Sequence, residues 1–421
     1  MPSPEAWRPL LAGTRRQEVL NLVREVAGRL AEPGAAQRAA EIARSQTGHP
    51  GSVYWLAQGL AQGDAGLALL FGQLDVCFPE EGWDRLAHRA LQEGVGNASR
   101  ESGMGLFSGL PGLALAAHLL SRHGRRYQKL LASLDAELSL LAQQALEVPL
   151  QASRAARDWD LVSGLVGLGV LAWTRNHPAL PDVLARLETM ANQTSSGSGF
   201  FVPGECIANP SLREEAPEGH LDLGLAHGIA GPLALLGLTG DSGPTQATRR
   251  LADLLEANRS DDEWGPNWSA AAPLRDGLLV AGPPTHAAWC YGAPGIARAL
   301  WNAGFRERAL EAMQAVAYRT PQARRLVSPG LCHGFAGLLA HALRFWNDSD
   351  DPAMRSLALE MVARLEEEWN PQAPLGFQAV EPGGVRVDQP GFLEGAPGVA
   401  LALLAAATDC EPGWDRVLLL S

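Results

Sequence analysis

The chain of 421 residues is 46% hydrophobic and carries a formal net charge of −12. This length is enough for a large core, and the negative charge, without any Lys/Arg-rich block, argues against a nucleic-acid-binding surface. No apolar run reaches the roughly 18 residues that a membrane-spanning helix needs. We therefore expect a protein that neither binds nucleic acid nor spans a membrane.

Two further features indicate where the protein resides. Residues 1–5 lack a basic region followed by an apolar stretch, so we expect no signal peptide. The five cysteines are odd in number and far apart in a long chain, which argues against a disulfide framework. Both features indicate a reducing, cytoplasmic setting.

After a first segment of helical periodicity, residues 15–43, the chain repeats one pattern seven times. Each repeat consists of Gly-x-x-Gly followed by an apolar run, and successive repeats lie 42 to 64 residues apart. Such self-similarity is the signature of a repeat architecture. The first glycines of the repeats are Gly63, Gly109, Gly164, Gly228, Gly292, Gly334 and Gly395.

These repeats predict an all-α fold. Each interval has room for two helices and their loops, and glycine permits the turn that leads into each apolar helix. An open array of repeats needs polar faces at its ends. Because the seventh repeat is as apolar as the middle ones, we expect a closed α/α toroid of seven inner and seven outer helices. Residues 1–421 would then form a single domain.

Three polar excursions interrupt the repeats, at residues 192–222, 258–285 and 369–392. They contain clusters of Gly, Pro, Ser or Asp, and the last contains a short strand signal at residues 385–387. We expect loops with small β insertions, placed at one end of the toroid.

Equivalent positions of successive repeats are expected to lie side by side at one end of the barrel. Cys290 and Cys332 each stand two residues before a Gly-x-x-Gly, and His333 follows the second cysteine. Two thiols and one imidazole suit zinc, and three protein ligands leave a fourth position for substrate. The sequence predicts one zinc ion per chain at these residues. The alternative is a pair of buried cysteines with a histidine that caps a turn.

The same register adds candidate catalytic residues. His227 directly precedes Gly228 and is a candidate acid or base, or a histidine that caps a turn. Asp160 is a candidate to orient that imidazole, or a solvated or helix-capping aspartate, and Asp158 is the alternative carboxylate. Tyr291 can either form a hydrogen bond or simply pack.

These motifs resemble those of the lanthionine synthetase C-like family, in particular of its stand-alone bacterial lanthipeptide cyclases. The resemblance rests on the seven Gly-x-x-Gly repeats and three motifs, and it extends over nearly the whole chain. It implies an α/α toroid with a small β-containing insertion and one zinc ion. The motifs are Trp-Cys-Tyr-Gly at 289–292, Cys-His-Gly at 332–334 and His-Gly at 227–228.

The resemblance also implies roles for single residues. One position departs from the family pattern, because members often carry an arginine four residues before the first zinc cysteine and this chain has His286 there. If that arginine orients the site or stabilises developing charge, His286 would do so only when protonated. The implied roles are zinc ligands at Cys290, Cys332 and His333, an active-site histidine at His227, an aspartate at Asp160 and the tyrosine after the first ligand at Tyr291.

The implied function is cyclisation of a dehydrated precursor peptide in lantibiotic biosynthesis. A cysteine thiol of that peptide would add to a dehydroalanine or dehydrobutyrine, with His227 as the acid that protonates the α-carbon, and give a lanthionine or methyllanthionine ring. The implied partners are the precursor peptide, with its leader and core, a dehydratase and an exporter. One alternative is a prenyltransferase-like toroid enzyme, for which we would expect Asp-Cys-His ligands. Another is a non-catalytic zinc protein of the same fold that binds glutathione or a peptide.

Overall fold

The computed structural model describes most of the chain. Two segments lie outside the described residues. They are residues 1–5, where we expect no signal peptide, and residues 196–197 of the first excursion. The described ranges are 6–98, 103–152, 155–195, 198–240 and 243–421.

Helices dominate the structure and fall into two alternating series. Seven described helices are mostly buried, and each begins one or two residues after the first glycine of a repeat. Burial on nearly every side explains why most of these sequences are apolar all round rather than along one stripe, although the fifth and sixth include the arginines Arg298 and Arg344. These helices are α3 (Asp64–Cys77), α5 (Leu110–Leu119), α7 (Leu165–Thr174), α10 (Ala230–Thr239), α12 (Ala293–Asn302), α15 (Phe335–Ser349) and α17 (Ala396–Ala407).

The second series consists of amphipathic helices that bury one face. In α4, for example, Ala87, Ala90 and Leu91 are buried at helical spacing while charged residues occupy the remaining positions. The members of this series are α1 (Gly13–Ala31), α4 (Trp83–Gly96), α6 (Gln128–Glu147), α8 (Leu180–Gln193), α11 (Gln246–Ala257), α13 (Arg306–Tyr318) and α16 (Pro352–Glu368). Shorter helices are α2 (Ala35–Gln46), α9 (Pro210–Glu215) and α14 (Pro321–Arg324), and short 3-10 helices occur in several loops and near the C-terminus.

Eight short strands lie within the three excursions among the described residues. Their pairs are all antiparallel, and they form a four-stranded sheet in the order β1-β2-β5-β6 and two hairpins, β3-β4 and β7-β8. The strands are β1 (Phe201–Val202), β2 (His220–Asp222), β3 (Ser260–Asp262), β4 (Gly265–Asn267), β5 (Ala271–Arg275), β6 (Leu278–Leu279), β7 (Ala379–Val380) and β8 (Arg386–Val387).

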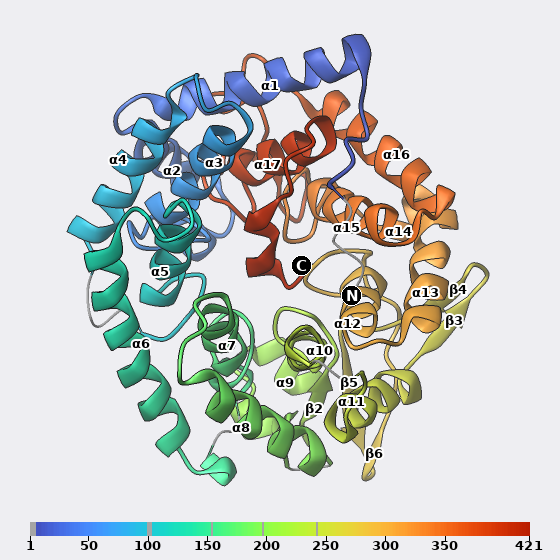
Figure 1. Cartoon of the computed structure of the whole chain (residues 1–421). Coiled ribbons are helices and arrows are strands. Elements are labelled where there is room, and N and C mark those ends of the chain that lie inside the picture. Colours follow the sequence, from blue (N-terminus) through green and yellow to red (C-terminus); the bar gives the residue numbers. More distant parts are fainter. Residues whose placement is uncertain (1–5, 99–102, 153–154, 196–197, 241–242) are drawn as a thin grey trace. The chain divides into compact units, whose positions relative to one another are not determined.

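The chain divides into two compact units. Unit 1 comprises residues 1–101, 115–128 and 326–421, and unit 2 comprises residues 102–114 and 129–325. In unit 1 the N-terminal helix α1 packs on the C-terminal helix α17, and α3 pairs with α4 as α15 does with α16 (Figure 1). In unit 2, α7 pairs with α8, α10 with α11 and α12 with α13. No helix in the described ranges combines the length and the apolar character needed to cross a bilayer.

A buried ion pair holds the C-terminal turn of unit 1. Arg344 on α15 donates from Nη2 to the Asp415 carboxylate at 2.9 Å, and the two side chains are only 7% and 1% exposed. The Arg344 guanidinium also lies 4.8 Å from the centre of the Trp7 ring, whose indole donates to the Ala405 carbonyl at 2.9 Å. One arginine therefore joins α15 to both terminal segments of the chain.

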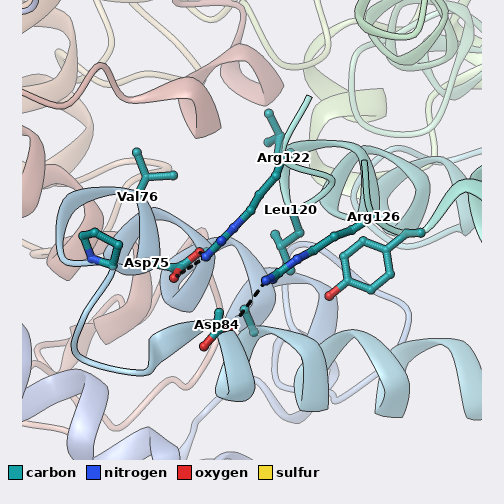
Figure 2. A pocket seen from close by; sticks show the side chains of 11 residues that line it. Asp75, Val76, Asp84, Leu120, Arg122 and Arg126 are labelled. Atoms are coloured by element: carbon teal, nitrogen blue, oxygen red, sulfur yellow. Dashed lines mark hydrogen bonds and ion pairs between the residues drawn. The ribbon is translucent and has the colours of Figure 1, made fainter. Parts of the chain in front are cut away.

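The turn that follows α5 is fixed to α3 and α4 by two further arginines. Arg122 donates to the carboxylate of Asp75 at 2.8 Å, and Arg126 lies 3.5 Å from the carboxylate of Asp84. Figure 2 shows both guanidinium groups reaching from this turn across a small cavity toward the two aspartates. Each arginine thus forms an ion pair with a carboxylate across the cavity, and the two pairs hold the turn after α5 against α3 and α4 within unit 1.

Loss of the buried pair should be costly. We expect Asp415→Asn to lower the free energy of unfolding by about 3 kcal/mol or more, because it leaves the buried Arg344 charge without its main partner. Urea denaturation followed by circular dichroism measures the change. The matched control is Glu367→Gln, which breaks an exposed pair with Arg364 and should cost less than about 1 kcal/mol. Equal effects of the two substitutions would contradict this assignment.

The four-stranded sheet contains a buried histidine with an altered pKa. His220, the first residue of β2, pairs with Val202 and Pro273 on the flanking strands and is only 4% exposed. Burial lowers the pKa of His220 to about 4, because the protonated ring loses its hydration. The imidazole is therefore neutral at neutral pH.

This shift predicts acid sensitivity. Between about pH 6.5 and pH 4 the unfolded chain binds a proton at His220 that the folded chain does not, so stability is lost as the pH falls. The loss is roughly 1.4 kcal/mol per pH unit. Relative to His220→Gln, the wild type should therefore lose about 2 kcal/mol between about pH 6.5 and pH 5 in urea denaturation. Parallel pH profiles of the two proteins would contradict a buried neutral imidazole.

Candidate metal centre and active site

Three potential metal ligands gather in the structure. The sulfur atoms of Cys290 and Cys332 and a ring nitrogen of His333 all lie within 4.8 Å of one another. Cys290 is buried and the other two residues are half-buried. The donors are two thiols and one imidazole, which is a set that zinc favours, and three protein ligands leave room for a fourth. The cluster is thus able to bind a metal ion.

The backbone around Cys290 depends on a glycine two residues later. Gly292 has φ +87°, a conformation that residues with a side chain rarely adopt, and a Cβ there would lie 2.3 Å from the His286 carbonyl oxygen. The Cys290 carbonyl accepts hydrogen bonds from the amides of Leu225 and Ala226, at 2.9 and 3.3 Å. These bonds tie the first cysteine to the segment that carries His227.

The second cysteine is held in an analogous way. The amides of Leu331 and Cys332 donate to the Leu393 carbonyl, at 2.7 and 3.0 Å. The next residue along that segment, Glu394, places a carboxylate oxygen 3.3 Å from Nδ1 of His333. A carboxylate beside a candidate metal-binding histidine fixes the orientation of the ring.

His227 and Asp160 form a close pair. Nδ1 of His227 lies 2.6 Å from Oδ2 of Asp160, while Oδ1 of Asp160 accepts from the amides of Ser163 and Gly164, at 2.6 and 3.1 Å. The Asp160 side chain is 2% exposed and that of His227 is 42% exposed. Burial is the largest single influence on His227 and disfavours its protonated ring, but the hydrogen bond to Asp160, together with the negative charges of Asp160 and Asp222, raises the pKa of His227 overall. The buried carboxylate therefore orients an imidazole that remains accessible.

The structure distinguishes the two candidate aspartates. Asp158 ends a 3-10 turn, and its carboxylate accepts from the amide of Ala155 at 3.0 Å. Asp160, two residues later, is the one that contacts His227. Asp158 thus stabilises a local turn.

Tyr291 forms a hydrogen bond with a carboxylate that sequence reasoning missed. Its hydroxyl donates to Asp222 at 3.0 Å, and its ring centre lies 6.4 Å from that of His227. Burial raises the pKa of Asp222 to about 6, although His227, the Gly224 amide and Tyr291 counteract this shift. Asp222 could have been noticed as an acidic residue five positions before His227, but it stood at the end of a polar excursion.

His286 occupies a different environment. Its side chain lines a cavity next to the four-stranded sheet, together with His220 and Ser269, and its Nδ1 lies 3.4 Å from the Thr285 hydroxyl. The ligand cluster consists of Cys290, Cys332 and His333 alone among the residues the structure describes. Glu394, like Asp222, was not predicted, because only the fold shows that it lies beside His333.

Comparison with known proteins places the chain in a family. The model of the family described as Lanthionine synthetase C-like protein matches residues 54–419. The chain belongs to this family. Lanthionine synthetase C-like proteins are metalloenzymes, in agreement with a cluster that is able to bind a metal ion.

Two relatives of this lanthionine synthetase C-like protein are informative. It is 26% identical to Nisin biosynthesis protein NisC of Lactococcus lactis subsp. lactis over 318 residues, which are 71% of this chain and 72% of that protein. The solved structure of Nisin cyclase matches it with a TM-score of 0.73 and 20% identity, over 92% of this chain and 98% of the other. This likeness confirms the expected α/α-toroid fold with small sheets.

Removal of one thiol should remove the metal. We expect purified Cys290→Ala and Cys332→Ala to contain far less than one zinc ion per chain, because two donors bind zinc much more weakly than three. Inductively coupled plasma mass spectrometry measures the zinc content, and far-ultraviolet circular dichroism checks that the helices persist. Cys206→Ala, outside the cluster, is the control and should leave the zinc content unchanged. Stoichiometric zinc in Cys290→Ala would refute the ligand set.

Proposed function

We propose that this protein is a zinc-dependent lanthipeptide cyclase. It adds cysteine thiols of a dehydrated precursor peptide to dehydroalanine or dehydrobutyrine and thereby forms lanthionine or methyllanthionine rings. Membership in the lanthionine synthetase C-like family supports this activity. The single observation that carries the mechanism is the clustering of Cys290, Cys332 and His333, next to the segment of His227, whose Leu225 and Ala226 amides donate to the Cys290 carbonyl.

The residues of the cluster would hold one zinc ion. Bound there, zinc would lower the pKa of an incoming peptide thiol, which is ordinarily about 8.5, and supply a thiolate at neutral pH. Cys290 and Cys332 would hold the ion as thiolates, and His333 would do so as an imidazole oriented by Glu394. A prenyltransferase-like enzyme would be expected to have an aspartate among its three zinc ligands. The cluster of this chain has two cysteines and a histidine instead.

His227 supplies the proton that the addition requires. As the sulfur–carbon bond forms at the β-carbon of the dehydro residue, the α-carbon must gain a proton. A carboxylate only accepts hydrogen bonds, so Nδ1 of His227 donates to Asp160 and Nε2 is left to serve the substrate. The proton lost by the peptide thiol restores the acid, and the peptide mass does not change.

The remaining polar residues position this acid. Asp160 is anchored by two backbone amides and holds the imidazole of His227. Tyr291 and Asp222 form a hydrogen-bonded pair beside it. An oriented acid next to a candidate zinc site favours a catalyst over a non-catalytic glutathione- or peptide-binding protein.

The setting follows from the same proposal. The substrate is a precursor peptide with a leader and a core, produced by a dehydratase and passed on to an exporter. The reaction takes place in the cytoplasm, where the five cysteines of the chain, none of which forms a disulfide in the described structure, stay reduced. The name of the relative, Nisin biosynthesis protein NisC, supports a role in peptide antibiotic biosynthesis.

A cyclisation assay tests the proposal. The zinc-loaded protein is incubated with a synthetic peptide that contains one dehydroalanine and one cysteine, and the remaining thiols are then alkylated. Ring formation protects the cysteine, so the unalkylated mass reports the product, and a sample without protein corrects for spontaneous addition. Complete alkylation of this peptide and of a dehydrated nisin precursor would contradict the proposed activity.

Substitutions of the acid pair should separate chemistry from metal binding. His227→Asn should lower kcat by about 10²- to 10⁴-fold, the usual contribution of general acid catalysis, with the zinc content unchanged. Asp160→Asn should lower kcat by about 10²-fold, because Asn keeps an oxygen for the two amides but loses the charge that holds His227. Asp158→Asn is the matched control and should retain kcat. Similar losses at positions 158 and 160 would overturn the assignment.

A further inference from the structure

A cavity of about 480 Å³ lies within unit 2, on the face of the four-stranded sheet that carries His220. Its walls come from β2, β5, the end of α9 and the loop 282–286. This volume is within the range of protein ligand sites, which is roughly 300 to 1,000 Å³. The polar residues that line it include Glu215, His220, Ser269, Arg275, His286 and Arg325.

One polar group of the cavity wall lacks a partner. His220 is 96% buried, and its Nδ1 makes no hydrogen bond within the described part of the chain. A buried polar atom without a partner costs free energy, so native structures usually satisfy such groups. This imidazole nitrogen, on the wall of a cavity, is therefore available to form a hydrogen bond with a ligand.

The rim of the cavity is cationic. Arg275 and Arg325 are both exposed there, against the single carboxylate of Glu215. Arg325 is fixed to the loop 282–286 by a hydrogen bond from Nη1 to the Pro284 carbonyl at 2.8 Å. In a chain with a net charge of −12, the charged residues that line this cavity are two arginines and one glutamate, a net charge of +1. Guanidinium groups in this arrangement suit a carboxylate.

Both walls of the cavity continue into the candidate active site. Side chains two residues apart on a strand point to the same face, so Asp222 lies about 7 Å along β2 from His220 on the cavity side. Asp222 receives the hydroxyl of Tyr291, and His227 follows five residues later. The opposite wall, the loop 282–286, ends four residues before Cys290.

Apolar surface lies next to the rim. Leu278 on β6 pairs with Arg275 on β5, and its side chain is 71% exposed. Val280, two residues later, is also exposed. An exposed apolar side chain beside a cationic rim suits a peptide chain better than a small inorganic anion.

From these observations we propose that the cavity is a subsite for a carboxylate-bearing segment of the substrate peptide, which Arg275 and Arg325 attract and His220 receives by a hydrogen bond. This inference rests on the proposed cyclase function for the identity of the peptide. An Asp or Glu bound here, on a chain that runs along β2, places neighbouring residues of the peptide toward Asp222 and His227. The cavity thereby selects which cysteine and dehydro residue reach the acid. His286, on the facing wall, serves as a positioning residue of this subsite.

The test uses labelled synthetic peptides of about 14 residues, long enough when extended to pass both sites. Each contains one dehydroalanine and one Asp, and the Asp is moved residue by residue along the series, with Asn in a matched second series. Serine replaces the cysteine for binding measurements by fluorescence anisotropy, so that no reaction is needed. Cysteine is present for kinetic measurements. The proteins are the zinc-loaded wild type, Arg275→Gln, His220→Gln and the control Arg249→Gln, an exposed arginine on α11.

We expect one or two Asp positions to bind the wild type about tenfold more tightly than the Asn peptide does, the usual effect of a hydrogen bond with a charged group. Arg275→Gln should abolish this preference and raise KM while leaving kcat unchanged, and Arg249→Gln should keep it. His220→Gln should weaken it. Because Arg275 is exposed, its substitution tests the proposal even if His220→Gln folds poorly.

The outcomes separate this inference from the proposed function. If the wild type cyclises the peptides and no Asp position alters binding, the subsite does not exist and the cyclase function stands. The same conclusion follows if the preference survives in Arg275→Gln. If the preference is present in the wild type and lost in Arg275→Gln while no peptide is cyclised, the subsite stands and the cyclase function falls.

Discussion

Backbone hydrogen bonds in the loops before the apolar helices determine where the chemistry of this protein lies. In four repeats the amide of the first glycine donates to the carbonyl four residues earlier, as from Gly228 to Gly224 at 3.0 Å. Loops of neighbouring repeats also bond to one another, as Leu161 does to Ala226 and Leu225 to Cys290. These bonds convert similar sequence positions into adjacent positions in space. A helical framework then holds functional side chains that all come from loops.

Much of this arrangement could be predicted from the sequence, because it depends on local patterns. The Gly-x-x-Gly repeats predicted where the buried helices begin, because the turn before such a helix needs glycine locally. The toroid was then inferred from the number of repeats and the apolar character of the last one. The proximity of Cys290, Cys332 and His333 was predicted from their equivalent places in two successive repeats. The same reasoning chose Asp160 over Asp158 as the partner of His227, and the structure shows that contact.

What sequence reasoning missed depends on contacts between segments far apart in the chain. Glu394 lies 61 residues after His333, and Asp222 lies 69 residues before Tyr291, so no local pattern links them. The cavity beside the sheet needs strands from two excursions, paired as β2 and β5. His286 lies four residues before Cys290 in the sequence, and in the structure it lines this cavity.

The division of the chain into two units has a consequence for biosynthesis. Unit 2 is nearly continuous, with most of its residues at 129–325, whereas unit 1 joins the first hundred residues to the last hundred. On the ribosome, synthesis of all residues of unit 2 is complete before α15, α16 and α17 are translated. The packing of α1 on α17 and the Arg344–Asp415 pair form only after synthesis ends. The segment that carries Cys290, Asp160 and His227 is therefore complete before Cys332 and His333 are translated, so the three candidate metal ligands exist together only after the chain of unit 2 has been synthesised.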